Sequence, residues 1–131
     1  MTTTVDLLDA IRAHLAEFEL PAISSVHVAA SIPTPQVAVQ LADHQPPHIA
    51  RALLAWVDTL VGVTAEMWRV PQGDCVHLSV TGLLTGGACI QVYGSLRFIE
   101  RGLGADLAPD ATTTIPLAAL RQAATLGDVT A

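Results

Sequence analysis

Four side chains of this sequence are of types that could do chemistry together: two histidines, one glutamate and one tyrosine. His27, Glu66, His77 and Tyr93 all stand in segments where apolar and polar residues alternate, as they do in β-strands. Imidazole and carboxylate groups bind zinc, and they also serve as general acids and bases. We therefore consider His27, Glu66 and His77 as candidate metal ligands. The competing interpretation is that each histidine is a solvated or hydrogen-bonded side chain on a polar strand face.

The two cysteines and the glycine-rich segment carry no recognisable catalytic or cofactor motif. Neither Cys75 nor Cys89 follows a nucleophile pattern, and both are expected to remain free thiols. Residues 82–87 include three glycines but are not followed by the lysine and the serine or threonine that end a phosphate-binding loop. We therefore predict no catalytic residue and no cofactor, and we expect a binding protein rather than an enzyme.

The chain is acidic and poor in charge. Of its 131 residues, 14% are charged and 51% are hydrophobic, and the formal net charge is −6. Nucleic-acid binding needs a clustered basic face, which six basic residues spread along an acidic chain do not provide. A surface with so few charges favours an oligomer or a covered patch. We expect a homodimer, with another protein as a further partner and no nucleic acid.

The N-terminal segment indicates a cytoplasmic protein. No basic stretch precedes its first apolar residues, and these are spaced rather than continuous, so no signal peptide is predicted. The longest apolar run covers residues 52–57, far short of a bilayer span. We therefore expect reduced cysteines and no membrane partner.

Two segments have the residue spacing of amphipathic helices. The first begins with threonines before Asp6, which favours a capped helix start. The second, residues 45–62, opens with two prolines and ends at Gly62, a natural helix stop. A short strand leading into a helix is predicted for residues 113–125. The residues predicted to face the core are Val5, Leu8, Ile11, Leu15 and Phe18 in the first helix, and Ile49, Leu53, Trp56, Val57 and Leu60 in the second.

Five segments alternate like strands and are bounded by proline or glycine turns. The predicted fold class is α+β: a roughly five-stranded antiparallel sheet with two main helices packed on one face and a short C-terminal element. No repeat or linker divides the chain, so residues 1–131 are expected to form one domain whose ends, about 1–3 and 126–131, fray. The strand segments are residues 25–30, 36–41, 63–70, 75–81 and 88–96, with a tight loop at residues 32–35.

Pairing the last two strand segments with His77 directly opposite Tyr93 brings all their apolar side chains to one buried face. In this register Cys75 and Cys89 are on the order of 20 Å apart, so they are not expected to form a disulfide.

The opposite face of these two strands and of the neighbouring strand, residues 63–70, is the predicted binding surface. It is formed by Trp68, His77, Gln91 and Tyr93. A tryptophan and a tyrosine among small polar residues are typical of a binding face, because each ring combines a large apolar area with a polar group. Two alternatives stay open: Trp68 points into the core, or the C-terminal segment covers the aromatic rings.

The order helix, strands, helix, strands, helix in a small acidic chain resembles the element order of dimeric secretion chaperones, which clamp unfolded partner segments. The first run of strands is one strand shorter here, and a shared architecture does not transfer function. The leading hypothesis is an interaction module, homodimeric, that uses the open sheet face. The alternative is a small-ligand or metal site, with an enzymatic role, between the sheet and residues 97–112, with His27, Glu66, His77 and Tyr93 as its candidates.

Overall fold

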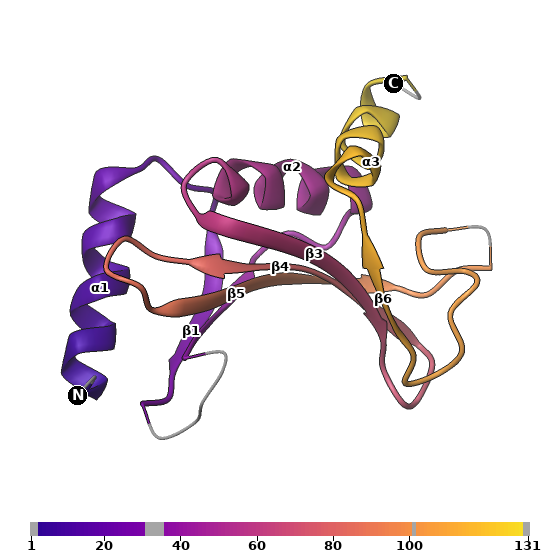
Figure 1. Ribbon diagram of the computed structural model, residues 1–131. Helices are drawn as coiled ribbons and strands as arrows, with labels where there is room; N and C mark the ends of the chain where they lie inside the picture. Colours follow the sequence, from indigo (N-terminus) through magenta and orange to yellow (C-terminus); the bar gives the residue numbers. More distant parts are fainter. Residues whose placement is uncertain (1–2, 31–35, 101, 130–131) are drawn as a thin grey trace.

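A six-stranded sheet with helices on one face forms the fold (Figure 1). The computed structural model describes residues 3–30, 36–100 and 102–129. The predicted α+β class, a sheet with helices on one side, is confirmed. The elements are α1 (Thr4–Glu17), β1 (Ile23–Val28), β2 (Val37–Leu41), α2 (Pro46–Val57), β3 (Val61–Arg69), β4 (Cys75–Leu83), β5 (Cys89–Arg97), β6 (Thr112–Ile115) and α3 (Leu117–Val129).

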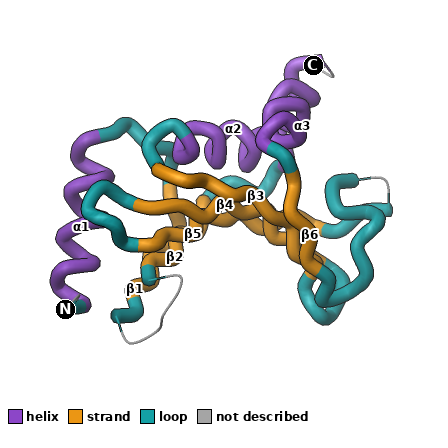
Figure 2. Tube along the Cα trace, in the orientation of Figure 1, coloured by secondary structure: helices purple, strands orange, loops and turns teal. Residues whose placement is uncertain are grey.

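The strands lie side by side in the order β1-β2-β5-β4-β3-β6 (Figure 2). Strands β3, β4 and β5 form the expected antiparallel meander. The sheet departs from the predicted, roughly five-stranded antiparallel one in two details: the short strand before the last helix, β6, joins the sheet beside β3 as a sixth strand, and β2 pairs with β5 in parallel. A parallel pair needs a long connection, and the chain supplies it by passing through α2, β3 and β4 before it reaches β5.

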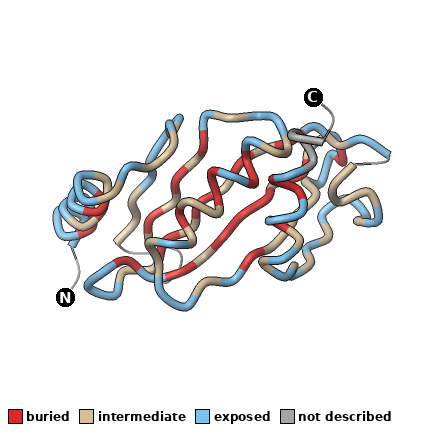
Figure 3. The backbone as a smooth tube through the Cα atoms, turned by 90° about the horizontal axis from the view of Figure 1, so that it is seen from above, coloured by how far each residue is buried: buried red, intermediate tan, exposed pale blue. Residues whose placement is uncertain are grey.

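Helix α2 lies across the sheet and supplies the centre of the core. Its side chains Ile49, Leu53 and Trp56 are fully buried, as predicted, and Figure 3 shows the buried positions concentrated along α2 and the strands below it. Helix α3 packs beside α2 and buries Leu120. The two helices therefore cover one face of the sheet, and neither of them lies on its other face.

A glycine lets α2 approach the sheet closely. Gly94 in β5 lies beneath Ile49, and a Cβ atom at position 94 would stand 2.7 Å from Ile49 Cγ2 and 2.9 Å from Cγ1. Carbon atoms do not pack at that distance, so any larger residue would push α2 away from β5. The absence of a side chain at this position therefore fixes the spacing between the two layers.

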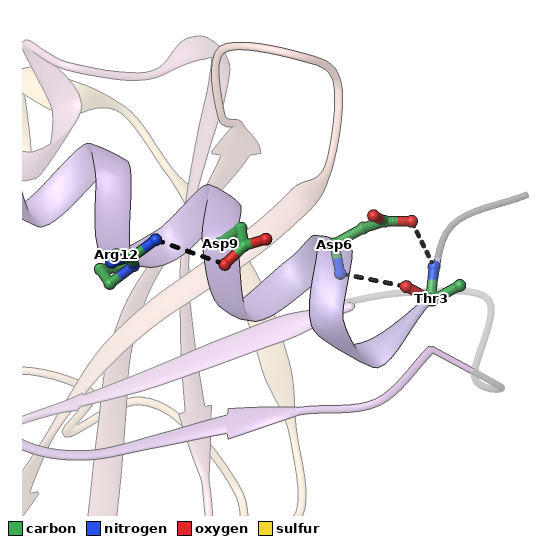
Figure 4. Close-up of polar contacts among 4 residues, drawn as sticks. All are labelled: Thr3, Asp6, Asp9 and Arg12. Atoms are coloured by element: carbon green, nitrogen blue, oxygen red, sulfur yellow. Dashed lines mark hydrogen bonds and ion pairs between the residues drawn. The ribbon is translucent and has the colours of Figure 1, made fainter.

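Helix α1 begins with a reciprocal capping box. The Thr3 hydroxyl accepts a hydrogen bond from the Asp6 backbone N–H at 3.1 Å, and the Thr3 N–H donates to the Asp6 carboxylate at 2.9 Å (Figure 4). These hydrogen bonds lower the pKa of Asp6, the backbone donor most strongly. The prediction that Val5 and Leu8 face the core was wrong, because they expose 64% and 46% of their surface.

The buried side of α1 instead presents Leu7, Ile11 and His14. His14 is only 3% exposed, and its ring stacks on Trp56 with a centroid separation of 5.5 Å. Its Nε2 lies 2.8 Å from the hydroxyl of Thr59, which itself donates to the Trp56 carbonyl. Since the single hydroxyl proton is used there, Nε2 must be the donor to Thr59. A polar residue thus occupies a buried position, beside Leu7 and Ile11, that an apolar helix pattern does not assign to it.

Two local predictions also need correction. The β4–β5 register differs by two residues from the predicted one, since His77 pairs with Ser95 and Tyr93 pairs with Ser79. A shift of two leaves every side chain on its predicted face. Gly62 does not end α2, which stops at Val57; with a φ of 65° it lies in β3, where the β3–β4 register shifts. The predicted loop at residues 32–35 and the chain ends at residues 1–2 and 130–131 lie outside the described residues.

Replacing Gly94 with alanine should destabilise the protein by about 1–3 kcal/mol, the usual cost of overpacking a filled core. Denaturant unfolding of Gly94→Ala measures this cost. The same substitution in an Ile49→Ala background should cost much less, because the three closest atoms all belong to Ile49. Equal costs in the two backgrounds would show that this contact does not set the layer spacing.

Candidate functional site

A cavity of about 440 Å³ opens on the helix-free face of the sheet. Its centre is a row of three side chains across β3, β4 and β5, in which Glu66 pairs with Ser79 and Ser79 pairs with Tyr93. Glu66 and Tyr93 are two strand spacings apart, about 10 Å, and the small Ser79 lies between them. The hollow exists because the middle residue of this row is small. The residues lining it are Glu66, Trp68, His77, Ser79, Gln91, Tyr93 and Thr112.

Three aromatic rings form one side of the cavity. His77 stacks on Tyr93 with ring centroids 5.1 Å apart and an interplanar angle of 17°. Trp68 meets His77 edge to face, also at 5.1 Å and with an angle of 85°. Stacked and edge-to-face contacts are favourable arrangements of aromatic rings, so the three rings restrict one another's orientation on the sheet.

The indole of Trp68 is hydrogen-bonded to the segment just before β6. Its Nε1–H donates to the Asp110 carboxylate at 3.1 Å. Asp110 has a φ of 67°, a conformation that aspartate tolerates better than most residues. Its N–H donates to the Arg69 carbonyl at 2.7 Å, just before β6 begins. Asp110 thus has two roles: it accepts the hydrogen bond of Trp68, and its own bond to Arg69 brings the start of β6, at Thr112, beside β3.

Arg69 holds this end of the sheet together. Its guanidinium lies 3.5 Å from the Phe98 ring centroid and donates to the carbonyls of Gly73 and Leu107 at 3.0 and 2.8 Å. These contacts join the β3–β4 turn, the end of β5 and the segment before β6. Arg69 therefore positions the walls of the cavity without lining it.

The floor and the histidine of the cavity are largely shielded from solvent. Ser79 is 6% exposed, while the rings and polar groups above it are half-buried. Burial lowers the pKa of His77 below its ordinary value of 6.5, because an imidazolium ion would lose hydration there. His77 is therefore a neutral ring at pH 7.

The structure brings the four predicted surface residues, Trp68, His77, Gln91 and Tyr93, to one cavity on the open face. Trp68 does not point into the core, and α3 does not cover the rings, since it packs against α2 on the opposite face. Of residues 97–112, beside which a ligand or metal site was predicted, Thr112 lines the cavity and Asp110 hydrogen-bonds to Trp68.

The three candidate metal ligands do not converge. Glu66 and His77 lie on neighbouring strands, but His27 is on β1, three strands from β4 and about 14 Å away across the sheet. Among the described residues, no group of three or more histidine, cysteine, aspartate or glutamate side chains could hold a metal ion. Cys75 and Cys89 are free thiols, and pair with Arg97 and Leu83 at opposite ends of the β4–β5 ladder.

The sequence does not identify three residues that shape the cavity: Ser79, Asp110 and Thr112. Nothing in the local sequence singles out Ser79, and Asp110 and Thr112 belong to residues 97–112, for which the sequence predicts no strand. The small size of Ser79 between larger neighbours was a possible signal, but it becomes visible only in the correct register. The role of Asp110 depends on β6 returning to β3, for which no local pattern exists.

No protein-family model, curated protein or solved structure matches this chain. The resemblance in element order to secretion chaperones gains no support from these comparisons. Within the described residues, no helix combines the length and the apolar character needed to cross a membrane. Function therefore has to be inferred from the cavity itself.

Burial of two histidines should make the protein less stable at mildly acidic pH. The folded-state pKa values of His14 and His77 are lowered by desolvation, which Glu17 partly opposes at His14. The unfolded chain takes up protons near pH 6.5, whereas the folded chain resists them. The stability that these histidines contribute is therefore full above pH 7.5 and is lost as the pH falls through 6.5 toward their folded pKa values.

Urea unfolding between pH 8 and pH 5 measures this effect. His77→Gln should flatten the loss of unfolding free energy with falling pH, because one of the two shifted groups is removed. His44→Gln is the control, since His44 is exposed, and it should leave the pH dependence unchanged. A wild-type profile that stays level between pH 7.5 and 5 would contradict the expected shifts.

Proposed function

We propose that this protein is a binding module that receives a small group, a ligand or one side chain of a partner, in the cavity around Trp68, His77, Gln91 and Tyr93. The observation that carries the proposal is the cavity itself, in which stacked aromatic rings and polar side chains surround the small Ser79. Ser79 is 6% exposed and makes no hydrogen bond to any described residue. Its hydroxyl is not one of the buried polar atoms without a partner, of which the described residues have one, Trp56 Nε1, so the hydroxyl reaches the cavity and can bond to a bound molecule or water.

The polar groups around Ser79 support the same proposal. Within residues 3–30, 36–100 and 102–129, Glu66, Gln91 and Tyr93 also make no hydrogen bond or ion pair with the protein. The aromatic rings beside them are fixed by stacking. Apolar walls with a few convergent polar groups in about 440 Å³ are typical of a ligand pocket.

Binding accounts for this arrangement better than catalysis does. Ser79 and His77 are two residues apart on β4, about 7 Å along the strand, and no hydrogen bond joins them in the described structure. Nucleophilic catalysis needs a base within hydrogen-bond reach of its nucleophile. An acid–base role for Glu66 and His77 stays the alternative, and catalytic turnover of a bound ligand would favour it.

Filling the cavity should abolish binding without unfolding the protein. In Ser79→Leu the added side chain would extend into the empty space, so the sheet need not shift. Binding can be followed through the two indole N–H signals in NMR spectra, because the Trp68 indole borders the cavity and that of Trp56 is in the core. Trp68→Phe assigns the two signals.

The probe set is the series of N-acetyl amino-acid amides together with agmatine, benzoate and phenol at millimolar concentration. At least one compound should shift the Trp68 signal and leave that of Trp56 in place, and Ser79→Leu should lose the response. Ser25→Leu is the matched control, since Ser25 is exposed in the same row of the open face on β1. A set with no responding compound would refute the proposal.

We also propose that the protein is a homodimer. Val5 and Leu8 of α1 and Val26 of β1 are exposed, and these two elements lie at the same end of the molecule (Figure 1). Strand β1 is an edge strand, and no other strand of the described residues pairs with its outer side. Exposed apolar residues beside a free strand edge favour pairing with a second chain.

Native mass spectrometry should therefore show a dimer. Leu8→Glu and Val26→Glu should shift it toward the monomer, because each buries a charge in the proposed interface. Ile99→Glu serves as the control, since Ile99 is exposed but follows β5 in a different part of the chain. A wild-type monomer at micromolar concentration would exclude this assembly.

A further inference from the structure

The charge of the cavity points to the class of molecule that it binds. Of the seven residues that line it, Glu66 is the one that carries a charge at neutral pH, because His77 is neutral there. No cation of the described chain forms an ion pair with Glu66. A carboxylate in the lining of a half-closed cavity attracts positive ligands and repels negative ones.

The basic residues nearest to the cavity do not neutralise Glu66. Arg97 is on the same face of β5 but four residues beyond Tyr93, about 13 Å along the strand. Arg69 is engaged by the Phe98 ring and by the carbonyls of Gly73 and Leu107. The negative charge of Glu66 is therefore left for a ligand.

The aromatic walls suit a cation with an apolar stem. A positive group is attracted to the faces of tryptophan and tyrosine rings, and such interactions strengthen where water is excluded. Asp110 accepts the indole N–H of Trp68, which adds electron density to that ring and further favours a nearby cation. The hydroxyl of Ser79 and the amide oxygen of Gln91 can accept hydrogen bonds from its N–H groups.

Other ligand classes fit less well. An anion would face the Glu66 carboxylate without any cationic donor in the lining. A wholly apolar ligand would cover Glu66 and Ser79 and leave both without hydrogen-bond partners, which costs free energy.

We infer that the cavity binds an organic cation, an ammonium or guanidinium group on an apolar stem, with its charge at Glu66 and its stem against Trp68 and Tyr93. This inference rests on the proposed function of the cavity and gives the class of its ligand. A free amine and the lysine or arginine side chain of a partner present the same chemistry.

The test compares one cation with its neutral isostere. N-acetyl-arginine amide and N-acetyl-citrulline amide have nearly the same shape but differ in charge. The arginine compound should shift the Trp68 indole signal with an affinity at least about tenfold higher than that of the citrulline compound, the discrimination expected of one partly buried charge pair. Propylguanidine, which has the arginine stem and its single charge but lacks the amide backbone, separates the two sources: tighter binding than the arginine amide indicates a free organic cation, and weaker binding indicates a partner side chain.

Two variants locate the charge. Glu66→Gln should weaken binding of the cation about tenfold and bring it close to that of the citrulline compound. Glu19→Gln removes an equal charge from an exposed position after α1 and should change the affinity less than twofold. Equal affinities for the arginine and citrulline compounds, or an unchanged affinity in Glu66→Gln, would overturn the cation inference.

The outcomes also separate this inference from the function on which it rests. If a neutral or acidic probe shifts the Trp68 signal and Ser79→Leu abolishes that shift while the cations give none, the cavity is a binding site for another class of ligand. If no probe of any class shifts the signal, both the cation inference and the proposed function fail.

Discussion

The close contact between α2 and β5 at Gly94 is the constraint on which the rest of the structure depends. Because position 94 has no side chain, Ile49 lies directly on the backbone of β5. Helix α2 can then bury Leu53 and Trp56 as well, and α3 packs beside it. Among the described residues, α2 and α3 pack on this face, and the cavity lies on the face that neither of them covers.

The cavity is shaped by the small Ser79, and its aromatic wall is positioned by Asp110 and Arg69, which do not line it. Ser79 creates the hollow because Glu66 and Tyr93 flank it in the same row. The rings beside it are fixed by a chain of contacts that ends at Asp110 and Arg69. The aspartate adopts a positive φ there, a conformation that persists where surrounding contacts determine it. Trp68, which lines the cavity, is therefore positioned in part by Asp110 from a distant part of the chain.

The two proposed properties use different ends of the molecule. The cavity lies on β3, β4 and β5 and is closed at its side by β6, whereas the exposed apolar residues lie on α1 and β1. A dimer formed through α1 and β1 would leave the cavity of each chain open. The proposed dimer and the proposed cation ligand are therefore compatible. The low surface charge supports the proposed dimer, and the single carboxylate in the cavity lining supports the proposed ligand.

The sequence by itself determined the elements and the faces of the strands. Alternation along β4 and β5 placed His77, Gln91 and Tyr93 together, and the prolines and spacing of α2 assigned its buried side, because these are local patterns with fixed periods. The tertiary structure alone decided the pairing register, the parallel β2–β5 contact and the side of α1 that is buried. A shift of two residues preserves every strand face, so periodicity cannot distinguish one such register from the next. The hollow over Ser79 and the bond between Trp68 and Asp110 depend on that register and on the return of β6, which only long-range packing selects.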